Sequence, residues 1–140
     1  MAHDHLCVKI VLVGDHGVGK TSLFDAYCPG TVAGLDFAVK IVERHGLKLK
    51  LQVWDMLAGG ERFRALWEAQ KQQYFRGAAA AIVVFDLTNA SFMYGSGVAS
   101  IPQHVGEARR SNPELPIVLV GNKSDLPRSD NVKSPHHGCV

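Results

Sequence analysis

The sequence predicts an α/β fold, a three-layer sandwich with a mostly parallel sheet, one antiparallel hairpin and helices on both faces. Short apolar runs rich in β-branched residues alternate along the chain with segments of helical pattern. A glycine-rich turn joins the first of these runs to a helical segment, and two neighbouring runs are separated by a very short turn. These observations favour a layered α/β sheet.

Composition indicates one globular domain over residues 1–126, followed by a polar, disordered tail over residues 127–140. Hydrophobic residues make up 46% and charged residues 20% of the chain, as in ordinary globular proteins. The net charge of +2 is too small to predict nucleic-acid binding, and no apolar run is long enough to span a membrane. The cysteines form no metal-ligand or disulfide pattern, and no signal peptide precedes the domain. We therefore expect a cytoplasmic monomer.

The first strand and the first helix are predicted at the start of the chain. Residues 7–13 form a β-branched run that ends at a glycine, as a buried strand does. A helical pattern follows the glycine-rich turn over residues 20–27. A strand that leads through glycines into a helix is the local arrangement that a phosphate-binding loop requires.

An antiparallel hairpin is predicted from residues 37–44 and 47–54, which are separated only by His45-Gly46. Apolar and polar residues alternate strictly from Leu47 to Val53. Successive side chains of a strand point to opposite faces, so this alternation predicts one apolar face and one face of lysine and glutamine.

The second half of the chain continues the alternation of helix and strand. Residues 64–75 are rich in helix formers up to the break at Gly77, and residues 78–86 read as an interior strand. Residues 98–111 are a further helix candidate, in which Pro102 marks the first turn. Binding sites in such sheets lie beyond the carboxyl ends of the strands.

A phosphate-binding loop is predicted after the first strand, where G-D-H-G-V-G-K-T matches the pattern G-x-x-x-x-G-K-[ST] and indicates a P-loop NTPase. The glycines let backbone N–H groups surround phosphate oxygens, and the helix that begins there directs its positive end at them. Lys20 would reach the β- and γ-phosphates, and the Thr21 hydroxyl would hold Mg²⁺. A chance match is the alternative. The phosphate contacts are expected from Gly14, Asp15, His16, Gly17, Val18, Gly19, Lys20, Thr21 and Ser22.

Guanine recognition is predicted from N-K-S-D, residues 122–125, which directly follow the apolar strand 117–121. The Asp125 carboxylate can accept hydrogen bonds from N1–H and the exocyclic amine of guanine, a donor pair that adenine lacks. The Lys123 stem can lie over the purine plane. Asn122, Lys123 and Asp125 are therefore the expected base-binding residues.

The order G-D-H-G-V-G-K-T, W-D-M-L-A-G-G-E-R-F, Y-F-R-G-A, G-N-K-S-D resembles the small GTPases of the Ras superfamily, and is most similar to the Rab branch. The resemblance covers roughly residues 6 to 127. It implies a P-loop GTPase domain that binds GTP/GDP with Mg²⁺. The implied role is a switch in vesicle trafficking, located in the cytoplasm or on the cytosolic face of endomembranes. Its implied protein partners are effectors, exchange factors and activating proteins.

The resemblance also implies roles for single residues. Asp55 and Thr31 match the metal-binding aspartate and threonine, and Gly59 matches the glycine that senses the γ-phosphate. The matching aromatic triad for effector binding is Phe37, Trp54 and Tyr74. The plain structural alternatives are a strand-capping carboxylate for Asp55, an ordinary loop threonine for Thr31, and core packing for the aromatic residues.

The sequence departs from the family pattern around the second switch. Gly60 stands where the family has the glutamine that orients the attacking water, so no catalytic residue is assigned and hydrolysis is expected to be weak. Met56-Leu57 replace one threonine, which adds up to about 3.4 Å of chain before Gly59.

Further departures concern the first switch and the end of the chain. The four links from Tyr27 to Thr31 span at most about 14 Å, and the helix carries the chain roughly 10 Å away, so Thr31 returns to the metal with little slack. His16 fills a loop position where the family usually has glycine or serine, and its side chain either obstructs the water in line with the γ-phosphate or points into solvent. The family's last strand and helix have no counterpart after Leu126, and the ending H-H-G-C-V does not support a prenyl anchor.

Four hypotheses remain open from sequence. The chain is a hydrolysing GTP switch, or a non-hydrolysing guanine-nucleotide-binding module that docks partners through its aromatic residues. It is a P-loop ATPase or kinase of another branch, against which N-K-S-D counts, or a shortened isoform with impaired folding and nucleotide binding. Base choice, metal dependence and turnover separate them.

Overall fold

A computed structural model of the 140-residue chain describes residues 6–29, 37–55, 60–89 and 100–127. The side chains of residues 60–67 are outside this description. The predictions made for Thr31, for Gly59 and for the tail beyond residue 127 therefore also lie outside the described residues.

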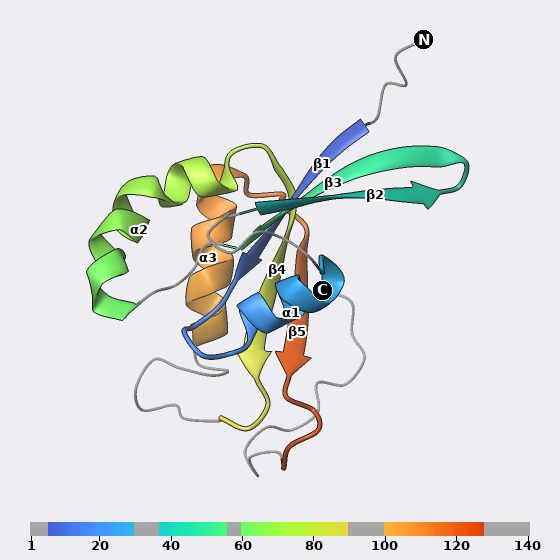
Figure 1. The fold of residues 1–140 in the computed structure, drawn as a ribbon. Helices are drawn as coiled ribbons and strands as arrows, with labels where there is room; N and C mark the ends of the chain where they lie inside the picture. Colours follow the sequence, from blue (N-terminus) through green and yellow to red (C-terminus); the bar gives the residue numbers. More distant parts are fainter. Residues whose placement is uncertain (1–5, 30–36, 56–59, 90–99, 128–140) are drawn as a thin grey trace.

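The described residues form a five-stranded sheet in the order β2-β3-β1-β4-β5 (Figure 1). Strands β1, β3, β4 and β5 are parallel, while β2 and β3 form the antiparallel hairpin. The prediction of a mostly parallel sheet with one antiparallel hairpin is confirmed. The bounds of the strands are Leu6–Val13 for β1, Phe37–Arg44 for β2, Leu47–Asp55 for β3, Ala78–Asp86 for β4 and Ile117–Asn122 for β5.

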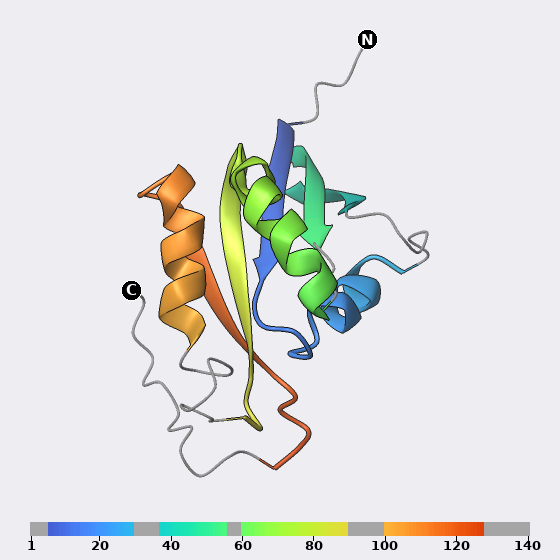
Figure 2. The same cartoon turned by 90° about the vertical axis from the view of Figure 1, so that its left-hand side faces the viewer.

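The helices cover both faces of the sheet, with α1 and α3 on opposite sides (Figure 2). Their bounds are Lys20–Tyr27 for α1, Gly60–Phe75 for α2 and Ile101–Ser111 for α3. Helix α2 begins four residues before the predicted start at residue 64, and α3 begins three residues after the predicted start at residue 98. Pro102 lies in the first turn of α3, where backbone N–H groups make no hydrogen bond within the helix, so its lack of an N–H has no cost there.

Two buried clusters hold these layers together. The larger cluster joins β1 and β4 to α2 and α3 through side chains such as Val11, Val83, Phe75 and Ala108. The smaller cluster lies on the other face, where Phe24 of α1 packs against β1, β2 and β3. The alternating side chains of β1 therefore enter different clusters, which fixes the strand between the two helix layers.

The apolar face predicted for β3 is buried at only one of its ends. Val53 is 7% exposed, whereas Leu47, at the hairpin turn, is 63% exposed. The difference follows from the short α1, which packs at the Val53 end of the strand. Leu47 thus belongs to the predicted apolar face of β3 but is exposed at the hairpin end of the strand.

Candidate nucleotide-binding site

The predicted phosphate loop joins the end of β1 to the start of α1 and depends on glycine at two crowded positions. Gly14 has φ +150°, and a Cβ atom there would lie 2.3 Å from the carbonyl oxygen of Val84. Gly19 has φ +95°, and a Cβ atom there would lie 2.2 Å from Nδ2 of Asn122. Strand β4 and the predicted base-recognition loop therefore lie so close to the backbone of this loop that only glycine fits at the two positions.

Lys20 is the buried cation of the phosphate loop, with 7% of its surface exposed. Its Nζ atom donates to the carbonyl oxygens of Gly14 at 2.7 Å and Asp15 at 2.8 Å. Burial lowers the pKa of Lys20, and the nearby carboxylates of Asp55 and Asp15 partly offset that effect. The ammonium is therefore held against the backbone of the loop, between the carbonyl oxygens of Gly14 and Asp15.

Thr21 and Asp55 bring two oxygen donors together at the mouth of the loop. The Thr21 hydroxyl donates to Oδ2 of Asp55 at 2.8 Å, which links the start of α1 to the end of β3. Mg²⁺ is usually held by one or two protein oxygens, with water and substrate phosphates completing its shell. This pair fits such an ion, and the residues that the structure describes contain no group of three His, Cys, Asp or Glu suited to a protein-only metal site.

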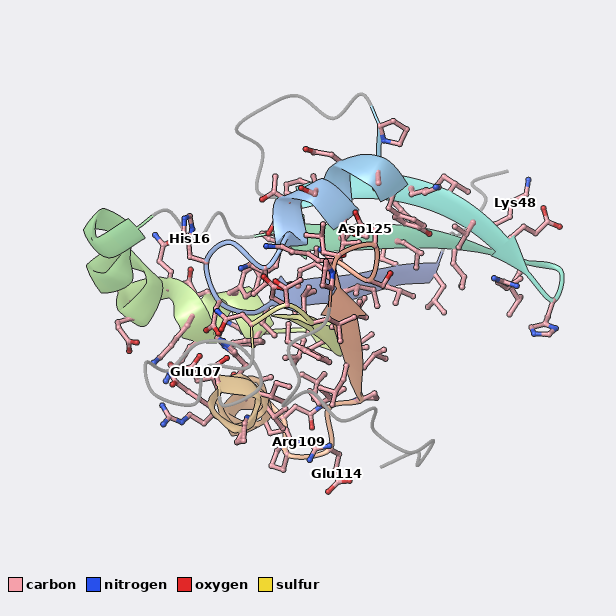
Figure 3. All side chains as sticks on the ribbon, turned by 90° about the horizontal axis from the view of Figure 1, so that it is seen from below. His16, Lys48, Glu107, Arg109, Glu114 and Asp125 are labelled. Carbon is pink, nitrogen blue, oxygen red and sulfur yellow. The ribbon has the colours of Figure 1, made fainter. Side chains whose placement is uncertain are left out.

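The base-recognition loop after β5 lies directly against the phosphate loop. Nδ2 of Asn122 donates to the carbonyl oxygen of Val18 at 2.9 Å, and Nζ of Lys123 donates to that of Gly17 at 2.8 Å. Asp125 is exposed on the same loop, and His16 is exposed on the phosphate loop (Figure 3). Segments more than a hundred residues apart in the sequence are thus in direct contact.

Asp86 is a residue of this site that the sequence patterns did not identify. Its carboxylate accepts hydrogen bonds from the backbone N–H and the hydroxyl of Thr88, and forms a 2.8 Å ion pair with Lys123. Burial alone raises the pKa of Asp86, but Lys123 and Thr88 lower it more, so the net pKa lies below its usual value. The only sequence signal was an acidic residue at the end of the predicted strand 78–86.

Ser100 and His104 of the α3 segment were also missed by the sequence patterns. Nε2 of His104 lies 2.9 Å from Oδ1 of Asp15, and the Ser100 hydroxyl donates to Oδ2 of the same carboxylate. Ser100 lies 85 residues and His104 lies 89 residues after Asp15 in the sequence. No sequence motif links residues so far apart, so only the fold reveals these two contacts.

The predicted aromatic triad is assembled on one face of the sheet. Phe37 stacks on Trp54 with ring centroids 4.8 Å apart, and Tyr74 meets Trp54 edge-on at 6.4 Å. Phe37 and Trp54 are partly exposed, whereas Tyr74 is only 4% exposed. Tyr74 therefore packs against Trp54 on its buried side, and its hydroxyl lies within hydrogen-bonding distance of two carbonyl oxygens, those of Leu12 and Trp54.

The Tyr74→Phe variant is expected to lose about 1–3 kcal/mol of unfolding free energy, because the carbonyl oxygens of Leu12 and Trp54 lose the hydroxyl donor that they share. Urea denaturation followed by circular dichroism measures the loss. Tyr27→Phe is the matched control, since Tyr27 is 42% exposed, and it should change the free energy by less than about 0.5 kcal/mol. Equal losses in the two variants would contradict the role assigned to the Tyr74 hydroxyl.

The remaining predicted positions have simpler environments. Ser22 is exposed on α1, and Gly60 is the first residue of α2. Because glycine has no side chain, position 60 contributes only backbone to the chemistry. None of the helices in the described part of the chain is long and apolar enough to span a membrane.

Comparisons with known proteins agree with this geometry. The Ras family model matches residues 9–137. The chain is 40% identical over 126 residues to the Ras-related protein Rab-19 of Mus musculus, covering 84% of this chain and 54% of the relative. It is 40% identical to SEC4 of Saccharomyces cerevisiae, a match that covers 85% of this chain and 54% of SEC4. It is 35% identical to RAB1BV of Beta vulgaris, a match that covers 91% of this chain and 58% of RAB1BV. The chain thus spans about half the length of these curated relatives.

Proposed function

Because the chain belongs to the Ras family and is similar to Rab proteins, we propose that it binds GTP and GDP with Mg²⁺ as a Rab-like switch in vesicle trafficking. One observation carries the nucleotide proposal. Asn122 and Lys123 of the predicted base-recognition loop donate to carbonyl oxygens of the predicted phosphate loop, which supports a ligand that contacts both loops. A nucleotide is the ligand that presents both a base and phosphates.

Each part of the site has a defined task in this proposal. Lys20 and the loop N–H groups bind the phosphates, and Asp125 accepts from the guanine edge. Thr21 and Asp55 would hold Mg²⁺, which neutralises phosphate charge when it is bound. Lys123 keeps the two loops together through Gly17 and Asp86.

Hydrolysis is proposed to be weak, because Gly60 offers no side chain to orient a water molecule. The second candidate function is a guanine-nucleotide-binding module without turnover, which docks partners through Phe37 and Trp54. Their partly exposed, stacked rings favour this candidate, since rigid aromatic surfaces commonly anchor protein partners. Single-turnover release of phosphate from bound GTP separates the two, and release no faster than in buffer supports the module.

The proposed location is the cytoplasm and the cytosolic face of endomembranes, with effectors, exchange factors and activating proteins as partners. This follows from the similarity to Rab proteins. Loss of a captured partner on substitution of Trp54 by alanine, with nucleotide affinity unchanged, would support the aromatic docking surface.

Titration with fluorescent GTP, GDP and ATP, with and without Mg²⁺, tests the nucleotide proposal. We expect saturable GTP and GDP binding that Mg²⁺ strengthens, and no competition by excess ATP. Effective competition by ATP would favour a P-loop ATPase instead. Absence of binding by a cooperatively melting protein would reject nucleotide binding altogether.

The Asp125→Ala variant is expected to weaken GTP binding about 100-fold, because charge-assisted hydrogen bonds to the base are lost. Affinity for ATP should change little, so the preference for guanine falls by a similar factor. Ser124→Ala, an exposed neighbour in the same loop, is the matched control and should keep wild-type selectivity. Unchanged selectivity in Asp125→Ala would show that this carboxylate does not read the base.

A further inference from the structure

The Asp15 carboxylate is turned toward α3 and is contacted there by two side chains. Oδ1 lies 2.9 Å from Nε2 of His104, and Oδ2 accepts from the Ser100 hydroxyl. The side chains of Asp15 and His104 are only 19% and 15% exposed. These contacts join the phosphate loop to a helix that supplies none of the residues in the recognised motifs.

The position of Asp15 in the phosphate loop makes its charge important. Its backbone carbonyl accepts from Lys20, and its carboxylate is close enough to raise the pKa of that lysine. A carboxylate beside a site for phosphates repels them, and this repulsion is strong where water is partly excluded. Some other group must offset the charge if phosphate binding is to be tight.

His104 is placed to supply that offset. Among the charged groups packed near it, Glu107 lies one turn further along α3 and is 3.9 Å from Nζ of Lys71 on α2. Lys71 also pairs with Glu68 of its own helix. The acidic residue on α3 is thus directed to α2, whereas His104 is directed to the phosphate loop and Asp15.

We propose that Ser100 and His104 are positioning residues for nucleotide binding, which hold the Asp15 carboxylate on the α3 side of the phosphate loop and offset its charge through their hydrogen bonds to its two oxygens. The phosphates then meet Lys20 without an uncompensated carboxylate beside it. This inference rests on the proposed guanine-nucleotide binding. It predicts an electrostatic effect that grows with the number of phosphates and that requires the charge on Asp15.

The test measures the affinity of the full chain for GTP, GDP and GMP by competition against fluorescent GDP. The His104→Gln variant should weaken GTP binding about tenfold, GDP binding less, and GMP binding less than about twofold. In the Asp15→Asn background, the same substitution should weaken GTP binding by less than about twofold, because no charge remains to be offset.

Gln103→Ala, an exposed neighbour on α3, is the matched control and should leave all three affinities unchanged. If His104→Gln weakened binding of all three nucleotides equally, or weakened GTP binding by the same factor in the Asp15→Asn background, the role of His104 would be purely structural and the inference would be overturned. If the His104→Gln variant is unfolded at the assay temperature, the double variant Asp15→Asn/His104→Gln is compared with Asp15→Asn. Equal GTP affinities of these two proteins would support the electrostatic role of His104, and a lower affinity of the double variant would contradict it. Absence of wild-type binding would instead reject the proposed function itself, and with it this inference.

Discussion

The Gly14→Ala variant is expected to lose about 3 kcal/mol or more of unfolding free energy, a large part of the stability of a typical domain. The new Cβ atom would lie 2.3 Å from the carbonyl oxygen of Val84 and 3.2 Å from Cγ2 of Val18. The first contact is with the backbone of a central strand, which cannot move without disturbing the sheet. The backbone at φ +150° adds further strain for any residue with a side chain.

Gly17→Ala is the matched control, because it lies in the same loop at φ +81° but a Cβ atom there would have no neighbouring atom within 4 Å. It should lose only about 1 kcal/mol, the cost of a left-handed backbone. Urea unfolding monitored by tryptophan fluorescence gives the unfolding free energy of each variant, and unchanged m-values would show that only stability differs. Equal losses at both positions would show that the close approach to Val84 does not limit the loop.

The Lys20→Ala variant is expected to bind GTP and GDP at least about 100-fold more weakly than the wild type, the second large effect. The buried ammonium is the cation held inside the phosphate loop, and its removal leaves the phosphates beside the carboxylates of Asp15 and Asp55. The loss should be greater for GTP than for GDP, since Lys20 would contact both the β- and the γ-phosphate. Equilibrium titration with fluorescent nucleotides measures both affinities.

Lys48→Ala is the control for charge, because Lys48 is exposed on the β2–β3 hairpin, away from the phosphate loop (Figure 3). It removes the same net charge and should leave nucleotide affinity within about twofold of wild type. Thermal melting without nucleotide shows whether Lys20→Ala remains folded. A folded Lys20→Ala protein that binds GTP within about tenfold of wild type would contradict the assigned role of this lysine.

The strands were predictable because their signals are local. Residues 37–44 and 78–86 were predicted with the bounds of β2 and β4, since β-branched runs between turn residues specify a strand without reference to distant contacts. The start of α2 was not predictable, because Gly60 gives no capping signal that separates the helix from the glycine-containing segment before it. The exposure of Leu47 depends on how far α1 extends over the sheet, which an alternating pattern does not reveal.

The site was predictable where a motif fixes the spacing and not where the fold brings residues together. The phosphate loop and N-K-S-D were found from sequence, and the structure places them in contact through Asn122 and Lys123. Asp86 and His104 act through contacts that no short pattern encodes. Thr31 and Gly59 remain predictions, as do weak hydrolysis and the metal.

The bonds from Asn122 and Lys123 to the phosphate loop have a consequence for the synthesis of the protein. The loop at residues 14–21 leaves the ribosome about a hundred residues before its partners in β5. Closing so long a segment is entropically slow, and β5 can dock only after β4 has formed the edge that receives it. The nascent chain therefore passes through a period in which the phosphate loop is present without the loop at residues 122–125, and under the proposed function selective binding of guanine nucleotide begins only after both have been synthesised.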